Sequence, residues 1–456
     1  MSHWKAWAAE YSWNTATGET TGRSKTHFNP TPSQNPSYCS GVKLASLPGP
    51  TAPDSTLIYD WNSVGNGRPA LPAVTLLDET LRDGLQSPSV QSPSLAEKLA
   101  GLELMNELGI EYVNVGLPGA SARALSEAVE LCRAIAARRY AIRPVCAGRT
   151  LLEDVAAIAQ VSQQAGMAIE ASLFVGSSPI RAVAEDWDLE FLLSRSKSAI
   201  DAARHADLPV TFVTEDSTRA RPETLRALFL LAVERGAARI CLCDTVGFAT
   251  PEGVAAVTQF SREIVGPRIG IDWHGHNDRG LAVANALSAA HAGADRLHAT
   301  ALGVGERVGN PPMELLLLNL LLSNAPRSLE RVSAYCQHFA RVLGIGVNDN
   351  QPLVGKNAFR TATGVHASAI AKAEAKSQWL ADHVYSLLSA ASVGQQASIA
   401  IGPMSGASNV QHWLGSHGIS ATPVLERAIL ERAKAADHVL TDEELLSVVS
   451  RLRREM

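Results

Sequence analysis

Residues 73–84 read AVTLLDETLRDG, in which an apolar run is followed at once by four charged side chains among six residues. The apolar run predicts a buried β-strand over residues 73–78. Charges that emerge from a buried strand cost free energy unless they meet partners. This stretch therefore predicts a strand whose carboxyl end carries either ion pairs or a functional site.

Short apolar runs alternate with longer amphipathic stretches along the rest of the chain. In the first amphipathic stretch, Leu95, Leu99, Leu102 and Leu108 recur on one face after Ser92-Pro93, which predicts a helix. The eight predicted strands lie at residues 73–78, 111–115, 141–146, 168–174, 209–213, 239–243, 268–273 and 296–301. Eight such units over about 250 residues match a closed (β/α)8 barrel, with an open doubly wound sheet as the alternative.

The positions of reactive residue types favour the closed barrel. They lie at or just after the carboxyl ends of predicted strands, which is the face where barrel enzymes assemble their active sites. These residues are Asp83, Glu215, Asp244, His274, His276 and Glu306. We therefore predict an α/β fold, a (β/α)8 TIM barrel followed by small, mostly helical C-terminal subdomains.

Four segments are predicted along the chain. Residues 1–69 are rich in Ser, Thr, Pro, Gly and Asn and read as an irregular N-terminal extension. Residues 70–325 hold the barrel. Residues 326–400 hold a linker helix, expected at residues 328–343, and a first subdomain, and residues 401–456 form a second, helical subdomain.

The composition excludes several classes of protein. Forty Lys and Arg against 45 Asp and Glu give a formal net charge of -5, which argues against a nucleic-acid partner. No apolar run approaches the roughly 20 residues that span a bilayer, and the N-terminus lacks a secretory pattern. Six Cys in a chain of 456 residues are too sparse for a disulfide scaffold and indicate a cytoplasmic protein.

A metal site is predicted at the end of the seventh strand. His274 and His276 are two residues apart, so both rings face the same way on a strand, and Asp83 can complete a ligand set. The alternative is that one imidazole bonds a backbone carbonyl and the other caps the next helix. Asn310, in the glycine-rich turn 303–310, would supply a neutral oxygen ligand or orient another ligand. Such mixed ligands tolerate Mg, Mn or Zn, so the native metal stays open.

Arg82 stands beside Asp83 in the first of these segments. A guanidinium keeps its proton, so it suits a substrate oxygen on which negative charge develops. Arg82 is also expected to be able to pair with Asp78 or Glu215.

Four ordered motifs resemble those of one enzyme family. They are Leu81-Arg82-Asp83-Gly84 and residues 244–247, 274–278 and 305–310. Together they resemble the metal-dependent 2-isopropylmalate, homocitrate and citramalate synthase family, from about residue 75 to the C-terminus. The resemblance implies acetyl-CoA as co-substrate, a divalent metal ion, and a homodimer in which a subdomain of one chain reaches the active site of the other.

The resemblance also implies roles for individual residues. Gly364-Val365-His366 is similar to the catalytic-histidine motif of the family, and Tyr385 matches a later tyrosine. Glu215 would assist His366 in enolising acetyl-CoA, and Arg82 would stabilise the alkoxide. The metal is assigned to Asp83, His274 and His276 with Asn310 nearby. Arg149 and Thr245 are expected to contact the oxo acid.

Two departures from the family pattern concern the substrate. Asn114 stands where many relatives carry glutamate, and Arg181 where relatives often carry histidine. Both are expected to bind substrate, and the change of charge would favour a more anionic oxo acid, unless Arg181 points to solvent. No C-terminal regulatory domain is expected, and therefore no leucine inhibition of that kind.

The predicted function is an acyltransferase of the 2-isopropylmalate synthase type, which condenses acetyl-CoA with a 2-oxo acid, releases CoA and serves leucine biosynthesis. Homocitrate, citramalate and citrate synthases are the sister alternatives. Alternatives from other classes are a hydroxyacyl-CoA lyase or aldolase, a non-haem iron oxygenase, and a barrel without catalysis. Neither a nucleic-acid nor a membrane partner is expected.

Overall fold

The computed structural model describes residues 57–63, 71–323 and 327–455. The account below concerns these residues. Of the predicted extension 1–69, only residues 57–63 are described, and they contain the 3-10 turn η1 (Trp61–Ser63). The rest of that prediction lies outside the described residues.

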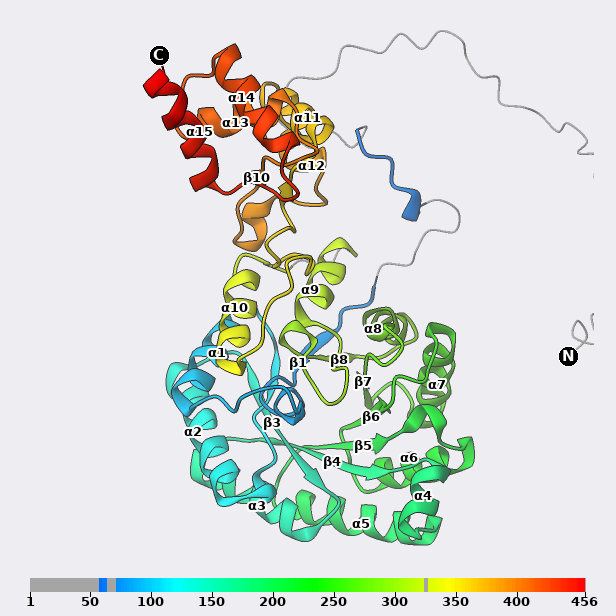
Figure 1. Cartoon of the computed structure of the whole chain (residues 1–456). Helices are drawn as coiled ribbons and strands as arrows, with labels where there is room; N and C mark the ends of the chain where they lie inside the picture. The colour runs from blue at the N-terminus through cyan, green and yellow to red at the C-terminus, as the bar shows by residue number, and fades with distance from the viewer. Residues whose placement is uncertain (1–56, 64–70, 324–326, 456) are drawn as a thin grey trace, which may run out of the picture. The chain divides into compact units, whose positions relative to one another are not determined.

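Eight parallel strands form a closed barrel, as predicted (Figure 1). The strands follow the chain order around the barrel, and β8 closes it by pairing with β1, where Thr75 lies opposite Arg296. An open sheet is thereby excluded. The strands are β1 (Thr75–Asp78), β2 (Tyr112–Asn114), β3 (Arg143–Arg149), β4 (Glu170–Gly176), β5 (Val210–Glu215), β6 (Arg239–Asp244), β7 (Gly270–Gly275) and β8 (Arg296–Ala299).

The predicted strands are confirmed, although several end later than expected. The third was predicted at residues 141–146, but β3 runs to Arg149, and β5 runs to Glu215 rather than residue 213. The apolar run marks only the part of a strand that is buried. Polar residues at the carboxyl end still pair with the neighbouring strand, as Gly176 does with Glu215. The carboxyl ends of the strands, which form the functional face, therefore extend beyond the apolar runs that predicted the strands.

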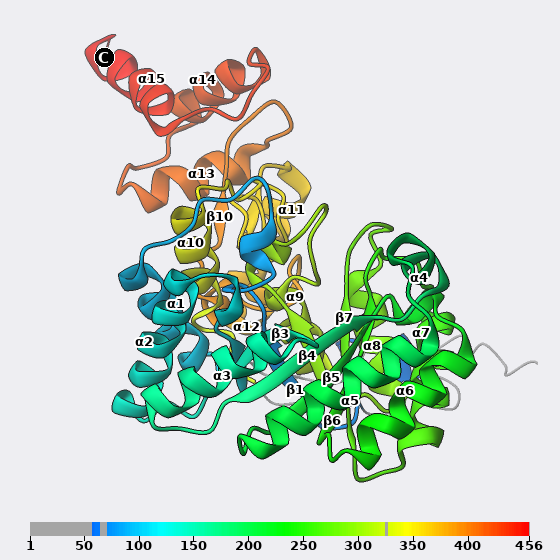
Figure 2. The ribbon, with the colours of Figure 1, turned by 90° about the horizontal axis from the view of Figure 1, so that it is seen from below.

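Helices surround the strands (Figures 1 and 2). The helix α1 begins after Ser94, not at Ser92 and Pro93, because Ser94 and Glu97 form a reciprocal capping box. The helices up to the end of the barrel are α1 (Leu95–Glu107), α2 (Ala122–Arg138), α3 (Leu152–Ala165), α4 (Pro179–Glu185), α5 (Leu189–His205), α6 (Pro222–Glu234), α7 (Pro251–Val265), α8 (Ala282–His291) and α9 (Met313–Leu322). Short 3-10 turns lie between them at η2 (Gly84–Gln86), η3 (Pro118–Ala120), η4 (Ser217–Arg219) and η5 (Ala301–Gly303).

Paired charges fill the lower part of the barrel interior. Arg296 is fully buried, and its Nε donates to Asp272 Oδ2 at 2.7 Å while Nη1 donates to Glu170 Oε2 at 3.0 Å. Arg239 Nε donates to the other oxygen of Asp272 at 2.6 Å. Buried charges persist when they are paired in this way, and these pairs connect β4, β6, β7 and β8.

The helix α10 (Val332–Leu343) connects the barrel to the rest of the chain, within the predicted linker range of residues 328–343. It packs against α1, and Tyr335 donates from its hydroxyl to Asp78 Oδ2 at 2.5 Å at the end of β1. Burial raises the pKa of Asp78 to about 6. Through this hydrogen bond, α10 contacts the end of β1, which immediately precedes the segment that carries Arg82 and Asp83.

The chain beyond α10 is mostly helical, as predicted. A two-stranded parallel sheet, β9 (Arg360–Thr361) with β10 (Ser398–Ile399), lies among α11 (Gly364–Glu374), α12 (Gln378–His383) and η6 (Ala390–Val393). The last helices are α13 (Ala407–Ser416), α14 (Pro423–Lys434) and α15 (Asp442–Glu455). They share a core of their own that includes Ile401, Trp413 and Ile429. The subdomain boundaries themselves stay predictions. No helix among the described residues is long and apolar enough to cross a membrane.

The contact between α1 and α10 yields a stability prediction. A Cβ atom at Gly101 in α1 would lie 2.4 Å from Cζ of Phe339, so Gly101→Ala should overpack this contact and destabilise the fold by about 1–3 kcal/mol. Thermal unfolding followed by circular dichroism should show a lower midpoint. Gly415→Ala in α13 is the matched control, because a Cβ there meets nothing within 4 Å. An unchanged midpoint for Gly101→Ala would contradict the packing.

Candidate active site

A cavity of about 260 Å³ opens at the carboxyl ends of the barrel strands. It collects most of the side chains that the sequence singled out. Those that line it are Arg82, Asp83, Asn114, Glu215, Thr245, His274, His276 and Glu306. The remaining predicted residues lie beside this cavity or in a second one.

Asp83 and the two histidines converge, as the metal prediction requires. Oδ2 of Asp83 lies 3.3 Å from Nε2 of His274 and 3.6 Å from Nε2 of His276, although β1 and β7 are almost 200 residues apart in the chain. All three side chains are buried. Their ligand atoms all lie within 4.8 Å of one another, which is a spacing that a single cation can bridge.

The protonation states of these groups also suit a cation. Burial raises the pKa of Asp83, but the charge of Arg82 and the contact with His274 outweigh burial and hold the pKa below its ordinary value. Burial lowers the pKa of His276 to about 4, and neighbouring His274 adds to the effect. A carboxylate and a neutral imidazole are the forms that bind a metal.

Asn310 holds the carboxylate of Asp83 in place. Its Nδ2 donates to Asp83 Oδ2 at 2.9 Å, while its Oδ1 is buried without a partner among the described residues. The glycine-rich turn makes this approach possible, because a Cβ at Gly305 would lie 2.0 Å from Asn310 Oδ1. In this geometry Asn310 orients Asp83 and leaves one oxygen free for a cation or its water.

Arg82 pairs with Glu79, which corrects the expectation that it would pair with Asp78 or Glu215. Its Nε donates to Glu79 Oε2 at 2.7 Å. The reason is local, because the turn after β1 places residues three apart on the same side. Burial raises the pKa of Glu79, but Arg82 and His298 outweigh it and hold the pKa well below its ordinary value. The guanidinium is thereby fixed next to the carboxylate of Asp83, with Nη1 4.0 Å from Oδ1.

His298 and Asp272 belong to the site and were missed from the sequence. His298 Nε2 lies 3.1 Å from Asp272 Oδ2, and its Nδ1 lies 3.3 Å from Glu79 Oε1 without the alignment of a hydrogen bond. Burial lowers the pKa of His298, but the two carboxylates outweigh it and raise the pKa. Period two along β7, counted back from His274, identifies Asp272, and the same alternation along β8 identifies His298.

Glu215 projects into the cavity from the end of β5. Burial raises its pKa, whereas Arg181 opposes this shift from 3.7 Å away. A carboxyl group with a raised pKa exchanges protons more readily near neutral pH. Arg181 itself does not line the cavity; it pairs with Glu185 at 3.1 Å and lies over the ring of Trp187.

Arg149 forms an ion pair with Asp154. Nε and Nη2 of its guanidinium donate to the two carboxylate oxygens at 2.9 and 2.8 Å, and Arg149 is not among the lining residues. Thr245 does line the cavity, and its Oγ1 accepts from the backbone N–H of Asp216 at 2.8 Å. Asn114 is buried at the end of β2 and also lines it. The substrate roles of these residues stay predictions.

His366 and Tyr385 lie together in a second cavity of about 320 Å³ formed by residues 357–412. Their rings stack with centroids 3.9 Å apart. Among the described residues, none lines both this cavity and the one at the barrel mouth. The structure therefore pairs the two predicted catalytic residues of the subdomain with each other and not with the metal ligands.

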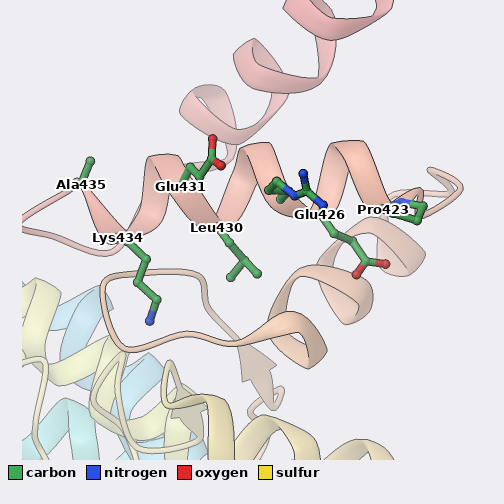
Figure 3. A pocket seen from close by; sticks show the side chains of 7 residues that line it. Pro423, Glu426, Leu430, Glu431, Lys434 and Ala435 are labelled. Atoms are coloured by element: carbon green, nitrogen blue, oxygen red, sulfur yellow. The ribbon is translucent and has the colours of Figure 1, made fainter.

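Two other features do not form a competing site. A hollow of about 690 Å³ runs along α14, with a lining drawn from residues 423–435 (Figure 3), and two of its charged side chains, Glu426 and Lys434, bond to other residues of the chain. Lys434 Nζ, for example, donates to the carbonyl of Pro403 at 2.8 Å. Cys241 and Cys243 are buried in β6 with their sulfurs 4.0 Å apart, and both line the barrel-mouth cavity already described.

Proteins of known name resemble the chain over most of its length. A 2-isopropylmalate synthase of Xanthomonas axonopodis pv. citri is 30% identical over 83% of this chain and 72% of its own. The homocitrate synthase AksA of Methanopyrus kandleri is 31% identical over 79% of this chain and 87% of its own. A candidate (R)-citramalate synthase, CimA, of the same organism is 30% identical over 84% of this chain and 68% of its own.

Solved structures show the same barrel. The HMG-CoA lyase of Pseudomonas aeruginosa matches with a TM-score of 0.52 at 20% identity, over 61% of this chain and 95% of the lyase. The HMG-CoA lyase of Brucella melitensis matches with a TM-score of 0.51 at 17% identity, over 60% and 99%. The HMGL-like family model matches residues 73–334. The chain therefore belongs to the HMGL-like family, and within it to the family of 2-isopropylmalate, homocitrate and citramalate synthases.

Proposed function

We propose that this protein condenses acetyl-CoA with a 2-oxo acid and releases CoA, in the manner of a 2-isopropylmalate synthase that serves leucine biosynthesis in the cytoplasm. The observation that carries the proposal is the convergence of Asp83, His274 and His276 beside a fixed Arg82. The homologous synthases form carbon–carbon bonds on different oxo acids, so homocitrate, citramalate and citrate synthesis are the alternatives.

A divalent ion such as Mg, Mn or Zn fits the three converging side chains. When bound there, it would supply Lewis-acid polarisation of the carbonyl of the oxo acid. Arg82 would hold the same oxygen as it becomes an alkoxide, because its guanidinium is fixed by Glu79 and always charged. Asn310 would keep the carboxylate of Asp83 in position.

The protein side chains would also move the protons. Glu215, with its raised pKa, and His366 would remove a proton from the methyl group of acetyl-CoA. The resulting enolate carbon would bond to the keto carbon, and the keto oxygen would take a proton to become a hydroxyl group. Water would then cleave the thioester, which gives a carboxylate and frees CoA as a thiol.

A hydroxyacyl-CoA lyase is the alternative from a different class, because the barrel is shared with HMG-CoA lyases. Those structures match only 60–61% of this chain, whereas the synthases match 79–84%. A match to 79% or more of the 456 residues is too long to lie within residues 1–334, so it extends beyond the barrel. This difference favours the synthase.

A homodimer would bring the two cavities together. Large apolar side chains are exposed in α4 and in loops after the barrel strands, including Ile180, Phe248 and Val308, and others are exposed near His366, including Val365 and Met404. Exposed apolar groups of this kind are typical of contact surfaces. We propose that the subdomain of one chain covers the barrel mouth of its partner and supplies His366 and Tyr385.

The proposed reaction predicts metal-dependent release of CoA. Purified protein should release free thiol from acetyl-CoA in the presence of a suitable 2-oxo acid, EDTA should abolish the release, and added Mg, Mn or Zn should restore it. A thiol-reactive dye measures the rate. Absence of release with every oxo acid, together with cleavage of a hydroxyacyl-CoA, would favour the lyase instead.

The ligand assignment predicts the effect of Asp83→Asn on metal binding. Loss of the only carboxylate in the set should weaken Mn binding, measured by isothermal titration calorimetry, by at least about 100-fold and abolish turnover. Gly305→Ala should weaken binding by about 10–100-fold, because it displaces Asn310. Asp437→Asn is the control, since that side chain is 98% exposed. Equal affinities for all four proteins would refute the assignment.

The shared site predicts complementation between two inactive variants. Mixed and reassembled Asp83→Asn and His366→Ala proteins should recover up to about a quarter of wild-type activity, because half of the dimers would be mixed and each would hold one intact site. Asp83→Asn mixed with His276→Ala should recover none, because both changes affect the same half-site. If the two mixtures recovered the same activity, the result would contradict the proposal that the subdomain of one chain completes the active site of the other.

A further inference from the structure

A second hollow lies at the opposite ends of the barrel strands from the metal ligands. Its volume is about 590 Å³, and its lining includes Tyr112, Arg143 and Glu170, which are the first residues of β2, β3 and β4. The cavity that holds Asp83 opens instead at the carboxyl ends of the strands. The proposed reaction uses none of the residues that line this amino-terminal hollow.

The amino-terminal hollow carries positive charge that the protein does not neutralise. Arg139 and Arg143 line it and are exposed, and neither forms an ion pair with an acid among the described residues. Glu170 is the only acid in the lining, and its carboxylate already accepts from Arg296 Nη1 at 3.0 Å and from Thr211 Oγ1 at 2.6 Å. Two cations without acidic partners in a concave surface favour an anionic ligand.

The local structure positions both arginines. Arg139 follows α2 with a left-handed φ of 55°, a conformation that is usual for glycine or asparagine and costs other residues free energy. Strain of this kind points to a role for the side chain. Arg143 precedes Pro144, which favours extended backbone, and its Nη1 donates to the hydroxyl of Tyr112 at 3.2 Å. A guanidinium that is already held in this way loses less freedom when it binds an anion.

Apolar surface lies beside these cations. Tyr112, Tyr140 and Met167 line the amino-terminal hollow and are half-buried, and Pro209 lines it and is exposed. Small-molecule sites of this size combine apolar surface with a few charged groups that fix the orientation of the ligand. An inorganic ion would leave the apolar surface in water, whereas an anion with an apolar body would contact both parts.

We propose that the amino-terminal hollow binds a small organic phosphate or carboxylate. Arg139 and Arg143 bind its anionic group, and Tyr112, Tyr140 and Met167 contact its apolar body. Guanidinium groups suit this task because their donors match the geometry of phosphate and carboxylate oxygens. Among the described residues, none lines both this hollow and the barrel-mouth cavity, so the ligand is distinct from the substrates of the proposed reaction.

The first test follows Met167 by NMR of the full chain with isotope-labelled methionine methyl groups, in which Met167→Leu assigns the signal. Phenyl phosphate or phenylacetate should shift this signal in a saturable titration, and the tighter of the two identifies the anionic group. The signal of Met404 should stay unchanged, because Met404 does not line the hollow. Benzyl alcohol, benzylamine and inorganic phosphate lack either the negative charge or the ring and should bind at least about tenfold more weakly. An unmoved Met167 signal with both anions, or equal affinity for benzylamine, would overturn the inference.

The second test removes the two charges. Arg139→Gln combined with Arg143→Gln should weaken binding of the tighter anion by at least about tenfold, and Arg139→Gln alone, should the double variant fail to fold, by at least about threefold. Arg133→Gln is the matched control, because Arg133 lies on α2, does not line the hollow and pairs with Glu130 at 2.7 Å. Unchanged affinity in the folded variants, or an equal loss in Arg133→Gln, would overturn the assignment.

Discussion

The closure of the barrel is the constraint on which the site depends. Because β8 pairs with β1, the ends of the first and seventh strands lie close across the mouth, and Asp83 Oδ2 comes within 3.6 Å of both imidazoles. An open sheet would place β1 and β7 apart. Closure alone does not fix the carboxylate, however. The glycine-rich turn after β8 places Asn310 against Asp83, and the hydrogen bond from Asn310 Nδ2 sets the position of Asp83 Oδ2, the oxygen that lies near both histidines.

A layer of paired charges supports this site from below. Asp272 accepts from Arg296 and Arg239, and it also contacts His298, whose ring lies against that of His274 with centroids 5.4 Å apart. Apolar residues could fill the same volume without the free-energy cost of removing charged groups from water. The charged layer instead provides directional contacts, which reach the site through His298 and Glu79. The orientation of Arg82 therefore depends, through Glu79 and His298, on residues that are far from it in the sequence.

The sequence was sufficient to predict the fold and the convergence of Asp83, His274 and His276, because local patterns marked the strands and a closed barrel brings the ends of the first and seventh strands together. Apolar runs marked all eight strands, and the spacing of His274 and His276 reported that they share a face. The pairing of Arg82 with Glu79 was not predicted, because Asp78, Glu79 and Glu215 are all plausible partners until the turn geometry is known. The ion pair between Arg149 and Asp154, five residues later, was also not predicted, and the substrate role of Arg149 stays a prediction.

Neither the sequence pattern nor the order of the strands predicts where His366 lies. A strand order fixes where strand ends meet, but it says nothing about where a subdomain attached through α10 presents its helices. Within one chain, the stacked rings of His366 and Tyr385 line a cavity separate from that of Glu215. The proposed removal of a proton from acetyl-CoA would need Glu215 and His366 near one methyl group and away from bulk water. The Glu215 side chain is 31% exposed within one chain, so the proposed reaction would need an element that covers the barrel mouth.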